Sequence, residues 1–405
     1  MLENAVVFIL SNAKYDAPLE STGYAVAKHL AKKNKVFYIE YPATIKDYFS
    51  NRKSPEFIKR KGLYKNSSNG LLKTEYPNLN ILITPILLSI NFLAEGYLYR
   101  KILSYNERLI LKRLRKVIKM LGIKDFIFIN SFNIHYPNIS ELLKAKLNVY
   151  HCVDPIVQSY DAKHGHISED IILDHSDIVI CTSKELYRNK IIKNPHTYFI
   201  PNAADFIHSS KALLDSTNVL PQLKDIKKPI IGYLGNLEAR TDFVLLKKLL
   251  AMNKDKSFIF VGPASDEALE KISGNIPNLF LVDKVAYKDM PSVLKGFDVA
   301  IIPFKKDNVS HTIFPLKLFE YLGSGKPVVS SDFNTDLDEF TNGSVPFCKD
   351  ANEFTDALND ALLNDTTAKR DFRLEIAKNN TWDRRLDEFS NILQKHYHNQ
   401  HDQKT

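Results

Sequence analysis

One stretch of the chain limits its fold more than any other: DVAIIPFKKDNVSHTIFPLKLFEYLGSGKPVVSSD, from residue 298 to residue 332. Its apolar run at 299–302 has the length and composition of a buried strand, the residues at 326–329 (KPVV) open another, and a helical segment lies between them. Pro315 suits a first helical turn, where no intrahelical N–H bond is lost, and two glycines then end the helix. The order strand, loop, helix, strand predicts a parallel α/β unit.

The start of that helix has the groups that bind phosphate. The N–H groups of a first helical turn have no intrahelical partner, and the helix dipole is positive there, so an anion is attracted. Lys317 adds a cation, and Glu320 follows one turn further along the same face. A cation and N–H groups for phosphate, with a carboxylate for hydroxyl groups, indicate a nucleotide-sugar site. The alternative is an ordinary amphipathic helix of an α/β domain.

The run PLKLFEYLGSGKPVV within this stretch carries a family resemblance. It resembles the donor-binding motif of GT-B glycosyltransferases, most closely that of the retaining glycosyltransferase family 4. In that family two glutamates are separated by seven residues; Glu320 fills the second place and Thr312 stands in the first. The resemblance implies substrate contacts from Thr312, Pro315, Leu316 and Glu320, with half of the glutamate pair missing.

A second element of the resemblance opens the C-terminal half. The run PIIGYLGN, residues 229–236, reads as a strand that ends in a glycine turn. In the resembled family a strand, a glycine and an arginine hold the donor diphosphate. The resemblance therefore implies a donor contact at Gly235 and a bidentate grip by Arg240. It also implies that backbone groups around Val285 meet the nucleobase.

The length of the chain and its pattern predict two domains. A chain of 405 residues exceeds the usual size of one core, and apolar runs alternate with helical or loop segments in both halves. We expect an α/β protein of GT-B architecture, with two Rossmann-like domains facing across a cleft. The predicted domains are residues 1–205 and 229–380, with a polar linker at 206–228. The resemblance further implies that a terminal helix at about 381–397 packs back on the first domain.

Polar residues follow the expected strands of the first domain, where ligands of doubly wound sheets bind. Gly23 opens the helix after the first strand, and in the resembled family a glycine there lies near the donor phosphates; a plain helix start is the alternative. His135 and Asp154 are candidates for contact with the acceptor or the transferred sugar, although an isolated loop histidine is more often structural. With Arg240 and Lys317 they form the candidate catalytic set.

By the resemblance, the reaction is glycosyl transfer with retention of configuration, without metal or cofactor. No side chain stands out as a nucleophile, and charge stabilisation of a departing diphosphate fits Arg240, Lys317 and the helix N-terminus. The pair Asp336 and Asp338 stands at the expected start of a helix, where the helix dipole stabilises acidic side chains, so the pair does not indicate a metal site. The expected donor is a UDP-sugar, with GDP-mannose second. The expected acceptor is a glycan or lipid-linked precursor of cell-surface polysaccharide.

Positive charge is concentrated in the first half. Residues 1–205 have a net charge of +10 and the remainder has −2. Residues 97–121 form a helical pattern with an apolar stripe from Leu98 to Leu121 and a basic opposite face, which is either solvated or held against anionic lipid. The longest apolar run, 81–94, is too short to span a bilayer, and the first residues lack the basic start of a signal peptide. Three cysteines without metal spacing indicate buried thiols in a reducing compartment. We expect a cytoplasmic protein that can associate with the inner face of the membrane.

Two other functions remain open from the sequence. A sugar-nucleotide epimerase on the same fold would need a carboxylate pair acting on the sugar, and Thr312 in place of glutamate argues against it. A non-catalytic basic binding protein is favoured by the missing glutamate and by the charge of the first half. Nucleic acid is not an expected partner, because the basic helix carries little interleaved aromatic surface and no reader motif is present.

Overall fold

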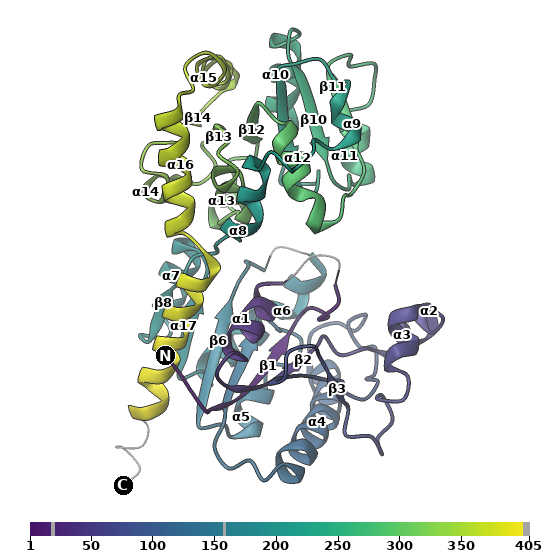
Figure 1. Cartoon of the computed structure of the whole chain (residues 1–405). Helices are drawn as coiled ribbons and strands as arrows, with labels where there is room; N and C mark the ends of the chain where they lie inside the picture. The colour runs from purple at the N-terminus through teal and green to yellow at the C-terminus, as the bar shows by residue number, and fades with distance from the viewer. Residues whose placement is uncertain (18–20, 157–158, 400–405) are drawn as a thin grey trace. The chain divides into compact units, whose positions relative to one another are not determined.

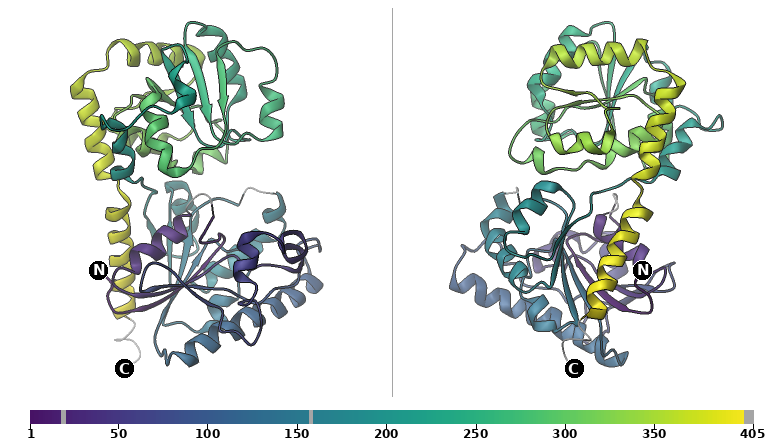
Figure 2. Two further views of the ribbon diagram at one scale, coloured as in Figure 1. Left: turned by 45° about the vertical axis from the view of Figure 1, so that its right-hand side comes forward. Right: turned by 90° about the vertical axis from the view of Figure 1, so that its left-hand side faces the viewer.

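The computed structural model describes residues 1–17, 21–156 and 159–399. The chain forms two compact units (Figure 1). The N-terminal unit comprises Met1–Pro201 and the chain from Leu386 onward, and the C-terminal unit comprises Asn202–Arg385. Each unit contains one predominantly parallel sheet with helices on both of its faces (Figure 2). The predicted α/β class with two Rossmann-like domains is confirmed.

The sheet of the N-terminal unit has the strand order β3-β4-β2-β1-β5-β6-β7-β8. All neighbours pair in parallel except β3 and β4, which are antiparallel. Its strands are β1 (Val6–Ser11), β2 (Lys35–Ile39), β3 (Leu71–Lys73), β4 (Leu79–Leu82), β5 (Ile127–Ser131), β6 (Leu147–Cys152), β7 (Ile178–Cys181) and β8 (Thr197–Phe199). The central strands are buried on both faces, which is why their sequences are continuous apolar runs.

The helices that begin in this unit are α1 (Thr22–Leu30), α2 (Ile45–Asn51), α3 (Pro55–Arg60), α4 (Tyr97–Met120), α5 (Ile139–Leu143), α6 (Ser159–Asp174) and α7 (Lys184–Lys190). The terminal helix α17 (Trp382–Asn399) joins them, because Leu386, Phe389 and Leu393 are buried and the N–H of Leu2 donates to Ser390 Oγ at 3.0 Å. From Leu386 onward the terminal helix therefore belongs to the N-terminal unit.

Helix α4 buries a different face from the predicted one. The expected apolar stripe consisted of Leu98, Ile102, Tyr105, Leu109, Leu114, Ile118 and Leu121. Of these residues only Leu114 is buried, whereas Leu98 and Tyr105 are 58% and 51% exposed. The buried face includes Tyr99, Leu103, Asn106, Glu107, Ile110, Leu111, Arg113, Leu114 and Val117. The sequence pattern was misleading because three polar residues of this face have partners inside the unit. Asn106 bonds the backbone of Leu88, Glu107 accepts from Asn138, and Arg113 donates to backbone carbonyls.

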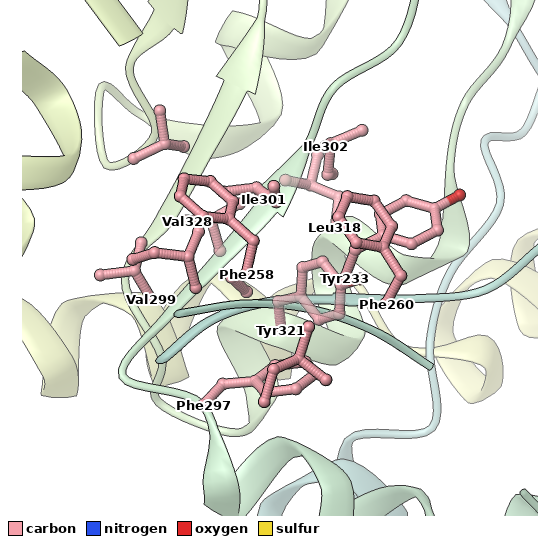
Figure 3. Close-up of a cluster of buried hydrophobic side chains, with 14 of the residues drawn as sticks. Tyr233, Phe258, Phe260, Phe297, Val299, Ile301, Ile302, Leu318, Tyr321 and Val328 are labelled. Carbon is pink, nitrogen blue, oxygen red and sulfur yellow. The ribbon is translucent and has the colours of Figure 1, made fainter. Parts of the chain in front are cut away.

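The sheet of the C-terminal unit is parallel throughout, with the strand order β11-β10-β9-β12-β13-β14. Its strands are β9 (Ile230–Leu234), β10 (Ser257–Val261), β11 (Leu279–Val282), β12 (Val299–Ile302), β13 (Val328–Ser331) and β14 (Phe347–Cys348). Figure 3 shows part of the core around β9, β10 and β12, including Tyr233, Phe258 and Phe297. Gly232 has no side chain at the position where the Phe297 ring packs, since a Cβ there would lie 2.2 Å from ring atoms.

The helices of this unit are α8 (Phe206–Ser209), α9 (Pro221–Lys224), α10 (Phe243–Met252), α11 (Asp266–Lys271), α12 (Met290–Gly296), α13 (Leu316–Gly323), α14 (Asp338–Thr341), α15 (Ala351–Leu363) and α16 (Thr367–Asn379). Residues 206–228, for which a linker was predicted, form α8, α9 and the 3-10 turn η1 (Ser210–Leu213). Their Ala212, Leu220 and Leu223 lie in the core of the unit, beside α12. In the described part of the chain, no helix combines the length and apolarity needed to cross a membrane.

Candidate functional site

The predicted phosphate-binding residues lie at the carboxyl edge of the C-terminal sheet. Strand β9 ends at Leu234, and α13 follows the neighbouring strand β12. Tyr321 of α13 ties the two together: its hydroxyl accepts a hydrogen bond from the N–H of Leu234 at 2.8 Å and donates to the carbonyl of Leu234 at 3.3 Å. Helix α13 is thereby held against the end of β9 through its second half, at the edge where doubly wound sheets bind ligands.

Lys317 lies over the end of β9. Its Nζ donates to the hydroxyl of Tyr233 at 2.7 Å and lies 3.9 Å from the centroid of the Tyr233 ring and 5.0 Å from that of Phe304. Gly235 makes this approach possible, since a Cβ at that position would lie 2.7 Å from Nζ. Gly235 also has φ +141°, which is costly for residues with a side chain. Residues 233–235 and Lys317 therefore form one packed arrangement.

The two charged residues of α13 have shifted pKa values. Burial lowers the pKa of Lys317 to about 7, and the nearby Arg240 guanidinium adds to this effect. Burial raises the pKa of Glu320 to about 7, partly offset by Lys317. Glu320 and Glu238 offset the lowering of the Lys317 pKa only in part, and among the described residues Lys317 forms no salt bridge, so a bound anion would stabilise its protonated form. Such shifts are typical of binding and catalytic sites.

Arg240 is near enough to Lys317 to affect its pKa, and it lies in the loop after β9. Its side chain is 43% exposed, and its Nε lies 2.8 Å from Oε1 of Glu238. The backbone of this loop is anchored, because the carbonyl of Arg240 accepts from the N–H of Lys305 at 2.9 Å and Thr241 bridges to Phe304. The main chain at Arg240 is thus fixed, while its guanidinium remains partly exposed beside Glu238.

The N-terminus of α13 has no side-chain cap. Pro315 is the N-cap residue and not, as predicted, part of the first turn, and Leu316 is the first helical residue. The first N–H groups of the helix are thus available to an anion. Two asparagine side chains hold the preceding loop: Asn202 donates to the carbonyl of Phe314 at 3.2 Å, and Asn334 to that of Ile313 at 2.9 Å. The sequence pattern placed Asn202 at a strand end, but it did not single out Asn334.

Thr312 uses its hydroxyl within its own turn. It ends the 3-10 turn η3 (Ser310–Thr312), is 7% exposed, and donates to the carbonyl of Val309 at 2.6 Å. The position that carries a glutamate in the resembled family is here part of the loop structure. Contact between Thr312 and a substrate stays a prediction.

The loop that was predicted to meet a nucleobase follows β11 at the edge of the sheet. Val285 helps to line a pocket of about 370 Å³, together with Gln222, Ile226, Phe280, Leu281, Val282, Asp283 and Lys284. Next to it, Tyr287 stacks on His208 with ring centroids 4.3 Å apart, and Nε2 of His208 lies 2.8 Å from the Tyr287 carbonyl. His208 belongs to α8, whose N-cap Asp205 also acts on the pKa of Glu320. Helix α8 thus connects this loop with α13. The sequence pattern that could have indicated this helix is Asp-x-x-His at 205–208, a helix cap located where the linker was predicted to begin.

The remaining predicted residues belong to the N-terminal unit. Gly23 lies in α1, where a Cβ would approach Ser131 Oγ to 2.6 Å, so the glycine lets the helix pack on the ends of the strands. His135 follows β5; its Nε2 lies 3.6 Å from Asp161, and its ring packs edge-on against Tyr41. Burial lowers the pKa of His135, and Asp161 acts in the opposite direction. Asp154, after β6, is exposed.

The comparisons with known proteins agree with this geometry. Residues 228–364 match the family model of glycosyl transferases group 1. A trehalose-6-phosphate structure from E. coli, bound with UDP-2-fluoro glucose, has a TM-score of 0.66 at 13% identity and covers 96% of this chain and 99% of that one. Anabaena HepE in complex with UDP has a TM-score of 0.63 at 14% identity, over 96% and 100% of the two chains. At such identities the likeness shows the fold alone.

Residues 228–364 thus match a group 1 glycosyltransferase domain, and the chain has the GT-B fold that the sequence resemblance predicted. It is also similar in sequence to TuaH of Bacillus subtilis strain 168, a protein described as a teichuronic acid biosynthesis glycosyltransferase. The two are 23% identical over 273 residues, which make up 61% of this chain and 66% of TuaH.

Proposed function

We propose that the protein transfers a sugar from a UDP-sugar to a glycan or lipid-linked acceptor in the synthesis of a cell-surface polysaccharide. The observation that carries this proposal is the packing of Lys317 over Tyr233 and Gly235 at the uncapped start of α13. The UDP ligands of two structures with this fold support the choice of nucleotide, and the description of TuaH supports the pathway.

The diphosphate is the group that this site can stabilise. As the bond between C1 of the sugar and the phosphate oxygen breaks, negative charge grows on the leaving UDP. Lys317, Arg240 and the first N–H groups of α13 are positioned to neutralise that charge with little rearrangement. Glu320, one turn further, accepts hydrogen bonds from the ribose hydroxyls when it is ionised. Val285 and its neighbours hold the base.

The acceptor oxygen forms the new bond to C1, and its proton passes to the leaving phosphate. This route needs no protein nucleophile and gives retention of configuration, in keeping with the family 4 resemblance. His135 and Asp154 are the candidates on the N-terminal unit for contact with the acceptor or the transferred sugar. We place the reaction in the cytoplasm, at the inner face of an anionic membrane, because the N-terminal half of the sequence is strongly basic.

Calorimetric titration with UDP and GDP, followed by hydrolysis assays on a panel of nucleotide sugars, tests the proposal. UDP should bind wild-type protein, and Lys317→Met should abolish most of that binding. The matched control is Lys326→Met, since Lys326 is a mostly buried lysine beyond the opposite end of α13 and its pKa is also lowered by burial, to about 8. Tighter binding of GDP than UDP, or equal losses in both variants, would contradict the proposed donor site.

A further inference from the structure

A helical segment of the N-terminal unit exposes apolar side chains to solvent. It runs from residue 45 to residue 65, between β2 and β3, and contains α2 and α3; we refer to it as the α2–α3 excursion. It lies at the right-hand margin of the unit in Figure 1. Helix α2 buries no residue. Ile45, Phe49 and Ile58 are 42%, 67% and 57% exposed, so this short segment presents a concentration of large apolar groups.

The excursion is firmly attached to the rest of its unit. Arg60 is fully buried and makes a two-point ion pair with Glu40, at 2.6 and 2.8 Å, and a third contact with Asp16 at 2.6 Å. A buried arginine with two carboxylate partners holds one geometry, because breaking either contact leaves a desolvated charge. Thr44 and Asp47 form a capping box at the start of α2. The exposed apolar groups are therefore presented by a fixed support.

Two basic residues of α4 hold the other end of the excursion. Arg113 donates to the carbonyls of Leu63 and Lys65 at 2.9 and 2.8 Å, and Lys116 donates to those of Ser67 and Ser68. These side chains were among those expected to make α4 the lipid-facing surface. Because Arg113 and Lys116 hold the excursion in place, the excursion is a better candidate than α4 for the surface that contacts lipid.

The exposed charge of the excursion is positive. Its exposed basic residues are Lys46, Arg52, Lys53, Lys59, Lys61 and Lys65. Among the described residues none of these six forms a salt bridge, and the exposed acidic residue of the segment is Glu56. Lys59 lies 5.0 Å from the centroid of the Tyr15 ring. Large apolar groups among exposed cations that no carboxylate neutralises are typical of a segment that lies in the interface of an anionic bilayer.

We infer that the α2–α3 excursion is the surface by which this protein docks on an anionic lipid bilayer. Phe49 and Ile58 enter the boundary between headgroups and acyl chains, and the basic side chains meet the headgroups. A second copy of the chain is a poorer occupant, because two such positive surfaces repel each other.

This inference rests on the proposed function, since docking on a bilayer would bring the protein to a lipid-linked acceptor. Asp16 and Glu40, the two anchors of Arg60, follow β1 and β2, so the excursion is fixed to the carboxyl edge of the N-terminal sheet. His135 lies after β5 at the same edge. Docking through the excursion would keep this edge close to the bilayer surface, where the reactive end of a lipid-linked acceptor is found.

Vesicle sedimentation with the full chain tests the apolar part. Wild-type protein should bind vesicles of equal parts phosphatidylglycerol and phosphatidylcholine. Phe49→Ser with Ile58→Ser should lower the partition coefficient about tenfold or more, since two large apolar groups no longer enter the bilayer. Ile192→Ser is the matched control, because Ile192 belongs to the same unit and is 82% exposed. Wild-type binding by the double variant, an equal loss in the control, or a dimer that only the double variant loses would overturn the inference.

A second pair of variants tests the charges. Arg52→Gln with Lys53→Gln should weaken binding about tenfold at low salt, with a smaller difference at high salt. The control changes two exposed lysines of α4, Lys112→Gln with Lys119→Gln, and its loss should be clearly smaller. If the α4 pair loses as much or more, α4 is the docking face and the inference fails.

Fluorescence gives a direct readout of insertion. The chain has one tryptophan, Trp382, so Phe49→Trp adds a single reporter whose emission should shift to the blue on anionic vesicles while wild-type emission stays unchanged. An unshifted spectrum on vesicles that sediment with the protein would place Phe49 outside the bilayer and overturn the inference. UDP binding is measured for every variant as well, because it reports whether the protein is folded and the donor site intact, independently of vesicle docking. Wild-type protein that docks on vesicles but does not bind UDP would refute the proposed function and leave the docking inference standing.

Discussion

At the scale of single residues, Glu320 is the sharpest test of the donor site. Hydrogen bonds to a charged group contribute about 1.5–3 kcal/mol, so Glu320→Ala should weaken UDP binding about ten- to hundredfold. Thr312→Ala should have a milder effect, because the Thr312 hydroxyl is already bonded to the carbonyl of Val309. Calorimetric titration of UDP against both variants measures the difference. Unchanged affinity in a folded Glu320→Ala protein would mean that the ribose lies elsewhere.

Lys317 should lower the stability of the free protein while serving ligand binding. Its folded pKa of about 7 lies below the usual value of 10.5. As the pH falls from about 10.5 to about 7, the unfolded chain takes up this proton before the folded one, so the free energy of unfolding decreases. Lys317→Met should therefore unfold at a higher temperature than wild type at pH 7, and the gap should close towards pH 10.

Thermal melts across this pH range, with and without UDP, measure the effect. UDP should raise the melting temperature of the wild type and leave that of Lys317→Met nearly unchanged, because only a bound ligand shifts the equilibrium. A constant gap at every pH would show that the variant differs through packing and not through the titration of Lys317.

The sequence was informative about residues whose arrangement depends on near neighbours along the chain. Lys317 and Glu320 share a helix turn, so their common face followed from spacing alone. The hydroxyls of Tyr233 and Tyr321 were not predictable, because they meet Lys317 and Leu234 only after separate strands and helices pack. The same holds for Asn202, whose amide reaches the carbonyl of Phe314 from a distant part of the chain.

At the scale of elements, the turn after β9 depends on glycine for two separate reasons. Gly235 has φ +141°, and a Cβ there would also lie 2.7 Å from Lys317 Nζ. Gly274 has φ +116° but has no atom within 4 Å of the Cβ position, so Gly274→Ala isolates the backbone cost. Each alanine variant should lose about 1–2 kcal/mol of stability through strain, and only Gly235→Ala should also weaken UDP binding.

Chemical denaturation and UDP titration of the two variants distinguish these effects. Equal UDP affinity in both would show that Lys317 Nζ can move aside without loss, and the close packing at Gly235 would then have no functional weight.

The elements were predicted unevenly. Strands buried on both faces were found because a short, continuous apolar run between turn residues is typical of a strand inside a parallel sheet. The predicted buried face of α4 was wrong, because Asn106, Glu107 and Arg113 are buried with partners that the local sequence pattern does not show. Residues 206–228 are polar enough to suggest a linker, yet Leu220 and Leu223 attach them to α12.

At the scale of the whole molecule, the chemistry should proceed without a metal ion. The charge that develops on a departing diphosphate can be neutralised by Arg240, Lys317 and the N-terminus of α13, which together replace a divalent cation. Within the described ranges, no three His, Cys, Asp or Glu side chains converge as ligands would. Sugar transfer, or hydrolysis of the UDP-sugar where no acceptor is known, should keep its rate in EDTA. The control is Lys317→Met, which should stay inactive whether Mn²⁺ is present or removed. A chelated wild-type enzyme that is inactive until Mn²⁺ returns would show that these cationic groups do not carry the leaving-group charge by themselves.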